Sequence, residues 1–222
     1  MIEFYTAATP NGWKVAIALE EMGLPYRVNA LDLSAGDQKT DDYLKLNPNG
    51  RIPTIVDDEA EGGPFTVFES GAILMYLAEK SQKLIPADPR GKSEALQWVM
   101  FQVGGLGPMM GQAAVFLRYA EERIEFAIGR YQRESMRLLE VLDTRLKSHE
   151  WLLGDAYSIA DIAHWSWAQA YRFIELDLGG LPHLTRWIDR IAERPAVQRG
   201  MKVPAPVEVD EAEIKRRRKG LA

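Results

Sequence analysis

The chain contains no cysteine, and this absence removes several kinds of chemistry at once. Without thiols the protein forms no disulfide, holds no thiolate-ligated zinc or iron–sulfur site and has no cysteine nucleophile. Its histidines, His149, His164 and His183, are too dispersed along the chain to form a metal motif. We therefore expect no metal, and any thiol chemistry must come from a bound small molecule.

The sequence also lacks an excess of positive charge and any long apolar run. With 27 basic and 32 acidic residues the formal net charge is −5, so no global positive field favours nucleic acid. No apolar segment approaches the roughly 20 residues needed to cross a bilayer, and residues 1–19 lack the apolar core of a signal peptide. We accordingly expect a cytoplasmic protein that acts without nucleic acid or a membrane.

Strand and helix patterns alternate over residues 1–80. The expected elements are strands at 1–7, 26–31, 51–57 and 65–68, with helices beginning at Thr9 and at Glu69. The first strand–helix–strand run favours a parallel strand pair, and the later strands fit a hairpin. This order predicts a small α/β domain.

The pattern changes after Lys80. Residues 81–90 (SQKLIPADPR) contain two prolines and are typical of a linker. Helical periodicity then recurs at 91–119, 125–149, 158–173 and 182–193, the third of which opens with a capping-box pattern at Ser158 and Asp161. We predict an all-helical domain over 91–203 and a solvated charged tail over 204–222. The basic run Lys215–Lys219 in that tail could bind nucleic acid or an acidic partner, but a solvated tail is favoured.

Two expected helix starts, Thr9–Gly12 and Glu69–Gly71, are the strongest chemical candidates. A helix N-terminus offers unpaired N–H groups and partial positive charge, which suit a carboxylate and lower the pKa of a thiol placed there. From the pattern alone the plainer interpretation, that Thr9 and Ser70 cap their helices, is favoured. Pro53 could follow a cis peptide bond that turns the backbone of Ile52 outward toward a peptide-like ligand, and spacing alone leaves this open.

Two further stretches have plain interpretations. The glycines and proline of Gln102–Gln112 (QVGGLGPMMGQ) predict a bent helix, with the close approach of another backbone or of a ligand as the alternative. Asp57 and Asp58 are predicted to be solvated turn residues rather than a catalytic acid pair.

Several segments together resemble the bacterial glutathione transferases, in particular the nu class, which includes glutathione-dependent disulfide-bond oxidoreductases. These segments are TPNGWKVAIALEE, LNPNGRIPTIVD, FESGAILMYLAEK, LQWVMFQVGGLGPMMGQ, AIGRYQRE and WLLGDAYSIADIA. The resemblance implies the glutathione transferase fold, with an α/β thioredoxin-like N-terminal domain and an all-α C-terminal domain. It also implies a homodimer, with glutathione bound as a co-substrate.

The same resemblance implies how glutathione would be bound. Pro53 would be the cis-proline, and the backbone of Ile52 would pair with the cysteinyl residue of glutathione. Ser70 would hold the carboxylate of the γ-glutamyl end, and Glu69 its amino group.

The remaining implied roles concern the other parts of glutathione. Gln38 and Arg51 would lie near its glycyl end or its backbone. Thr9 and Asn11 fall where the family places polar groups beside the sulfur, and are the candidate catalytic residues. Arg130 would reach glutathione from the partner subunit.

The run Thr9–Gly12 stands where other classes place a catalytic tyrosine, serine or cysteine. Since the chain has no cysteine, disulfide exchange would run through the thiol of glutathione. We therefore expect a glutathione-dependent enzyme, with disulfide reduction as the leading interpretation. Six tryptophans and Met109–Met110 leave open the conjugation of aromatic electrophiles or the cleavage of aromatic ethers. A non-catalytic interaction module of the same fold is the third interpretation.

Overall fold

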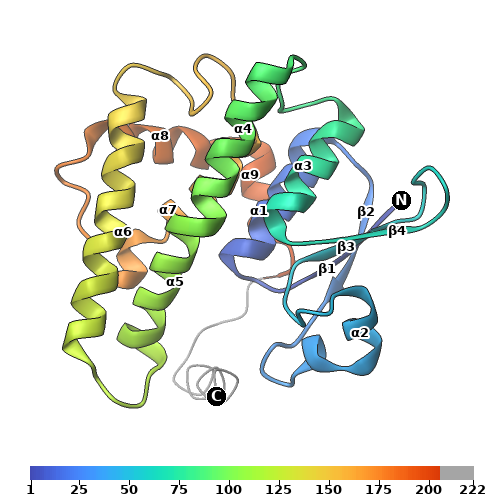
Figure 1. The fold of residues 1–222 in the computed structure, drawn as a ribbon, viewed down its shortest axis with the longest axis horizontal. Helices are drawn as coiled ribbons and strands as arrows, with labels where there is room; N and C mark the ends of the chain where they lie inside the picture. The colour runs from blue at the N-terminus through green and yellow to red at the C-terminus, as the bar shows by residue number, and fades with distance from the viewer. Residues whose placement is uncertain (206–222) are drawn as a thin grey trace. The chain divides into compact units, whose positions relative to one another are not determined.

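The computed structural model describes residues 1–205, which divide into two compact units (Figure 1). The first unit contains Met1–Lys83 and residues 195–205, and the second contains Leu84–Arg194. No helix within residues 1–205 has both the length and the apolar character needed to span a membrane. Most of the predicted tail, including Lys215–Lys219, lies outside the described residues.

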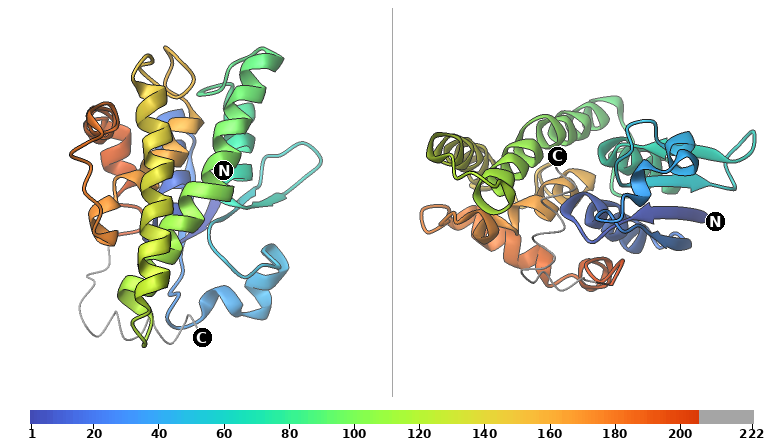
Figure 2. Two further views of the ribbon diagram at one scale, coloured as in Figure 1. Left: turned by 60° about the vertical axis from the view of Figure 1, so that its left-hand side comes forward. Right: turned by 90° about the horizontal axis from the view of Figure 1, so that it is seen from below.

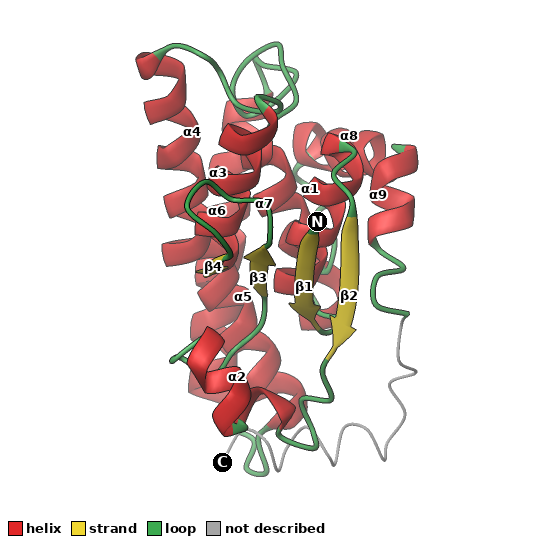
Figure 3. Ribbon diagram, turned by 90° about the vertical axis from the view of Figure 1, so that its right-hand side faces the viewer, coloured by secondary structure: helices red, strands yellow, loops and turns green. Residues whose placement is uncertain are grey.

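A four-stranded sheet with the order β2-β1-β3-β4 forms the centre of the first unit (Figure 3). β1 (Ile2–Thr6) pairs in parallel with β2 (Tyr26–Ala30), as the strand–helix–strand pattern predicted. β3 (Thr54–Asp57) pairs antiparallel with β1, and β4 (Phe65–Phe68) antiparallel with β3. β3 begins one residue after Pro53, because proline has no N–H to donate to the sheet.

Helices α1 (Pro10–Met22) and α3 (Ser70–Ser81) pack against each other in this unit. α1 begins with Pro10 in its first turn and ends at Gly23, whose φ of 69° is the left-handed conformation that glycine adopts without strain. Between β2 and β3 the chain forms the short elements η1 (Asp37–Lys39) and α2 (Asp41–Leu46).

Helix α9 (Pro195–Gly200), the last within residues 1–205, belongs to the first unit, although the predicted boundaries placed residues 91–203 in the helical domain. It packs on α1 so closely that a Cβ atom on Gly200 would lie 2.7 Å from the Cα atom of Ile17. The last helix predicted from periodicity ends at residue 193, so the sequence predicted neither α9 nor the core that it joins.

The prediction for Asp57 was wrong, because β3 continues through it and its side chain is fully buried. Its carboxylate accepts a hydrogen bond from the Tyr76 hydroxyl at 2.6 Å and pairs with the Lys80 Nζ atom at 2.7 Å. Burial alone would raise the pKa of Asp57, but the hydrogen bonds from Lys80 and Tyr76 hold it below its ordinary value. Tyr76 and Lys80 both lie in α3, so Asp57 is held by a helix that is distant from β3 in the sequence.

The second unit is helical throughout its regular structure (Figure 2). Its elements are α4 (Pro89–Phe101), η2 (Gln102–Leu106), α5 (Gly107–Ala114), η3 (Val115–Tyr119), α6 (Glu125–Leu146), α7 (Ile159–Ala168), η4 (Tyr171–Ile174) and α8 (Pro182–Ala192). The predicted helix over 158–173 is therefore interrupted: α7 ends at Ala168, and a 3-10 turn follows.

The glycine-rich stretch forms a widened π-helical turn at η2 and continues into α5. A Cβ atom on Gly111 would lie 3.3 Å from the Trp167 ring, and one on Gly107 would lie 2.5 Å from the Gln102 Nε2 atom. The π-helical turn agrees with the predicted bend, and the groups nearest to Gly107 and Gly111 are side chains rather than a ligand.

The predicted capping box at the start of α7 is present. Asp161 is fully buried, and its carboxylate accepts hydrogen bonds from the backbone N–H groups of Ser158 and Leu152 and from the Trp187 indole, each at 3.0 Å. Burial raises the pKa of Asp161 to about 6, and these hydrogen bonds act in the opposite direction. Asp161 thus ties α7 to α8 and to the loop that precedes α7.

Replacing Asp161 with alanine should lower the free energy of unfolding by about 3 kcal/mol, because several buried donors lose their acceptor. Urea denaturation followed by circular dichroism measures the change. Asp155→Ala, at an exposed position of the same unit, is the control and should leave the transition in place. Equal transitions for the two variants would contradict the role of Asp161.

Candidate functional site

Three segments that carry predicted site residues leave the same end of the sheet. In the strand register Tyr5 lies opposite Thr54, and Thr54 lies opposite Phe68. The end of β1, the start of β3 and the end of β4 therefore coincide, so the segments next to them emerge together (Figure 3). These segments contain Thr9 and Asn11, Ile52 and Pro53, and Glu69 and Ser70.

The first segment is the turn into α1. Thr9 is extended, and its hydroxyl oxygen accepts a hydrogen bond from the Gly12 N–H at 3.4 Å, so Thr9 caps the helix as its plain interpretation predicted. Asn11, the other candidate catalytic residue, is half-buried in the first turn. Gly12 is packed so tightly that a Cβ atom would lie 2.3 Å from the Ala7 carbonyl oxygen. The turn is thereby pressed against the end of β1.

The second segment precedes β3. The Arg51 carbonyl accepts hydrogen bonds from the Tyr43 hydroxyl and the Asn47 side-chain amide, both at 2.7 Å. The Ile52–Pro53 peptide bond is cis, as the resemblance implied. Within residues 1–205 no hydrogen bond engages the backbone N–H or carbonyl of Ile52. A segment held firmly on both sides therefore leaves one peptide-like donor and acceptor pair for a ligand.

The third segment is the turn into α3. Glu69 has a φ of 70° and a ψ of 117°, a backbone conformation that costs a non-glycine residue roughly 1–3 kcal/mol and clusters at functional sites. Its side chain makes no capping hydrogen bond to the helix. Ser70 does not cap the helix either: it is the first helical residue, and its Oγ atom accepts a hydrogen bond from the Lys14 Nζ atom at 3.1 Å. The plain capping interpretation thus holds for Thr9 and fails for Ser70.

Sequence reasoning did not select Lys14, which is only 1% exposed. It lies on the same face of α1 as Ile17 and Ala18, three and four residues further on, and both are fully buried. Burial lowers the pKa of Lys14 to about 7, while the negative charge of Glu69 acts in the opposite direction. A cation on the apolar stripe of a helix was the signal that could have identified it.

Gln38 and Arg51 also belong to the first unit. The Gln38 side-chain amide donates to the Leu33 carbonyl at 3.3 Å, while its buried Oε1 atom has no hydrogen-bond partner within residues 1–205. A ligand donor would satisfy such an oxygen. The side chain of Arg51 is exposed.

Arg130 is exposed on α6 in the second unit, so the structure of the first unit does not test its role. Within residues 1–205, no group of three or more histidine, aspartate or glutamate side chains lies close enough together to hold a metal ion.

Comparisons with known proteins identify the family and the fold. The model of the glutathione S-transferase N-terminal domain matches residues 8–80, and that of the C-terminal domain matches residues 107–195. The disulfide-bond oxidoreductase YfcG of Escherichia coli (strain K12) is 48% identical over 198 residues, which are 88% of this chain and 92% of that protein.

Solved structures are similar over the same length. A glutathione transferase of Burkholderia graminis, crystallised with two glutathione molecules per subunit, is 44% identical with a TM-score of 0.88, covering 93% of this chain and 89% of its own. A glutathione transferase of Pseudomonas putida, crystallised with one glutathione disulfide per subunit, is 43% identical with a TM-score of 0.87, covering 91% of each chain.

Replacing Gly12 with alanine should destabilise the first unit by about 1–3 kcal/mol, because the added methyl group must displace the backbone at the end of β1. Gly104→Ala is the matched control, since a Cβ atom there would meet nothing within 4 Å. Urea denaturation of both variants measures the difference. If Gly12→Ala unfolds at the same urea concentration as Gly104→Ala, the tight turn does not constrain the site.

Proposed function

The chain belongs to the glutathione S-transferase family, and on that basis we propose that it is an enzyme that reduces disulfide bonds with the thiol of bound glutathione. One observation carries the proposal: the turn Thr9–Gly12 provides a polar helix start and no thiol, in a chain without cysteine. If the chain reduces disulfides as its 48% identical relative is named for doing, the reacting sulfur must come from a ligand.

The first unit would bind glutathione along its exposed loops. The N–H and carbonyl of Ile52 pair with the backbone of the cysteinyl residue, in the manner of strand addition. The start of α3 receives the γ-glutamyl end: Ser70 and the uncapped N–H groups bind its carboxylate, and Glu69 binds its amino group. Gln38 and Arg51 contact the glycyl end, where the unpaired Gln38 oxygen supports a ligand contact.

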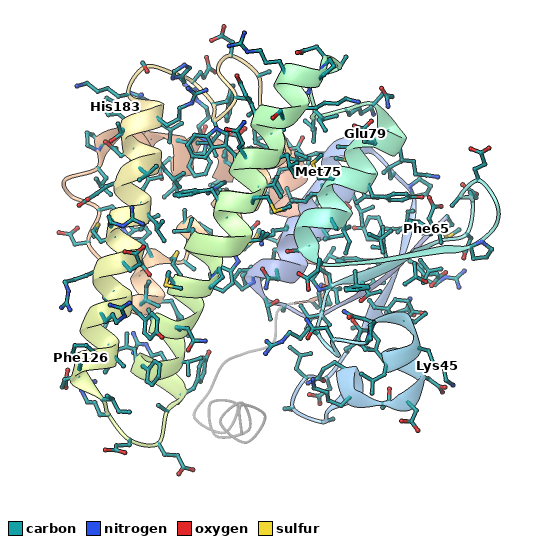
Figure 4. The ribbon with its side chains drawn as sticks, in the orientation of Figure 1. Lys45, Phe65, Met75, Glu79, Phe126 and His183 are labelled. Atoms are coloured by element: carbon teal, nitrogen blue, oxygen red, sulfur yellow. The ribbon has the colours of Figure 1, made fainter. Side chains whose placement is uncertain are left out.

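The enzyme acts as a cytoplasmic homodimer in this proposal, with Arg130 of the partner subunit reaching glutathione. A second copy could cover apolar side chains that each unit leaves exposed. Phe65 on β4 is 50% exposed and Phe126 on α6 is 76% exposed (Figure 4). No nucleic acid, membrane or metal enters the reaction.

The chemistry is thiol–disulfide exchange. The glutathione thiolate, stabilised beside Thr9 and Asn11 at the start of α1, attacks one sulfur of the substrate disulfide. A sulfur–sulfur bond forms between glutathione and that sulfur, the substrate bond breaks, and the leaving thiolate takes up a proton. A second glutathione thiolate then attacks the glutathione sulfur of the mixed disulfide, which releases the second substrate thiol and glutathione disulfide. The protein contributes orientation and thiolate stabilisation.

Reduction of hydroxyethyl disulfide tests the proposal, with glutathione reductase and NADPH recycling the glutathione. We expect enzyme-dependent turnover, and the double variant Thr9→Ala, Asn11→Ala should lose on the order of 100-fold in kcat, as when a preorganised donor is removed. Thr144→Ala, at an exposed position of α6, should keep wild-type activity.

Two outcomes would contradict the proposal. Glutathione binding without disulfide turnover would favour the conjugation of electrophiles or the cleavage of ethers, which product analysis then distinguishes. Turnover that survives in the double variant would show that the start of α1 does not activate the thiol.

A further inference from the structure

We propose that Lys14 is a positioning residue for glutathione: its buried amine holds a proton-dependent charge behind Ser70, so that binding of the γ-glutamyl carboxylate draws a proton onto the protein. The inference rests on the proposed function, because it takes Ser70 as the carboxylate subsite. It goes beyond that function by coupling the occupancy of the subsite to the protonation of a residue buried behind it.

The Ser70 hydroxyl group connects Lys14 to the proposed ligand position. Lys14 is 1% exposed and Ser70 is 6% exposed, and the Lys14 Nζ atom lies 3.1 Å from the Ser70 Oγ atom. Ser70 opens α3, where no side chain caps the helix. A carboxylate at this helix start would therefore lie on the other side of the Ser70 hydroxyl from Lys14.

The protonation state of Lys14 decides which way the hydroxyl points. A charged ammonium has only donors, so it occupies a lone pair of Ser70 and leaves the hydroxyl hydrogen available to the ligand. A neutral amine also carries a lone pair, which can accept that hydrogen and withdraw it from the ligand. The charged form of Lys14 thus prepares Ser70 to donate to a carboxylate, and it adds a buried positive charge behind it.

The surroundings of Lys14 place this choice near neutral pH. Burial lowers the pKa of Lys14 to about 7, and the negative charge of Glu69 at the start of α3 acts in the opposite direction. Other charged groups on α1, on the helices that pack against it and on the sheet pair among themselves: Glu20 with Arg199, Asp57 with Lys80 and Glu3 with Arg27. Glu21 and Glu79 lie near the C-terminal ends of α1 and α3.

A bound carboxylate favours the charged form of Lys14, and so it raises the pKa of Lys14. Below about pH 7 the amine is already protonated and binding takes up no proton; above it, binding takes up nearly one. By linkage, the affinity for the carboxylate then falls as the pH rises above the pKa of the free protein.

Calorimetric titration with S-methylglutathione measures the proton uptake directly, since this ligand has no titratable thiol. Titrations in buffers of different ionisation enthalpy should show close to one proton taken up at about pH 8 and almost none at about pH 6. The affinity should fall by about five- to tenfold as the pH rises from about 6 to about 8. Linkage allows a change of this size when the pKa of Lys14 in the free protein is about 7.

Two variants separate charge from packing. Lys14→Met fills the same space without a charge, and should bind more weakly with no proton uptake of its own at either pH. Lys14→Arg carries a permanent charge, and should retain affinity at about pH 8 without taking up a proton. A purely structural role for Lys14 would predict that neither variant changes the proton count. Circular dichroism checks that both variants fold.

The outcomes separate the role of Lys14 from the proposed function. Failure of the wild-type protein to bind S-methylglutathione at either pH would overturn the proposed function itself. Binding without proton uptake, or with equal uptake in wild type and Lys14→Met, would overturn the role of Lys14 and leave the proposed function standing. Should Lys14→Arg not fold, the comparison of wild type with Lys14→Met still decides the matter.

Discussion

In the sheet of the first unit Tyr5 lies opposite Thr54 and Thr54 opposite Phe68, and the candidate site depends on this register. It brings the start of α1, the cis-proline segment and the start of α3 to one end of the sheet. A slip of one residue would turn the buried side of each strand outward, so the hydrophobic core enforces the register. The hydrophobic core therefore fixes the relative positions of the three segments that form the candidate site.

At that end of the sheet the protein offers directed polar groups and no reactive sulfur. The free backbone pair of Ile52 and the uncapped start of α3 suit the peptide and carboxylate groups of glutathione, and the start of α1 suits its thiolate. The strained backbone of Glu69 is consistent with this use, because such a conformation persists only where the surroundings impose it. In this proposal glutathione supplies the reactive thiol, and the protein positions it.

The elements that sequence could predict are those with local causes. Thr9 and Pro10 start α1, Gly23 ends it, and Ser158 with Asp161 starts α7, because capping acts within a few residues. The family resemblance supplied the two-domain fold, which the comparisons confirm, and the cis bond before Pro53. The ion pair of Asp57, the packing of α9 and the hydrogen bond of Lys14 all depend on side chains of another helix. The periodicity of one segment gives no information about such distant partners.

The central claim is that the protein activates a thiol that it does not itself possess. Because the chain has no cysteine, the ultraviolet absorbance of thiolate in the complex arises from glutathione alone. Titrating this absorbance against pH gives the pKa of the bound thiol directly. The account predicts a pKa at least one unit below the value of about 8.5 for a free cysteine thiol. A bound glutathione whose thiol keeps its ordinary pKa would contradict it.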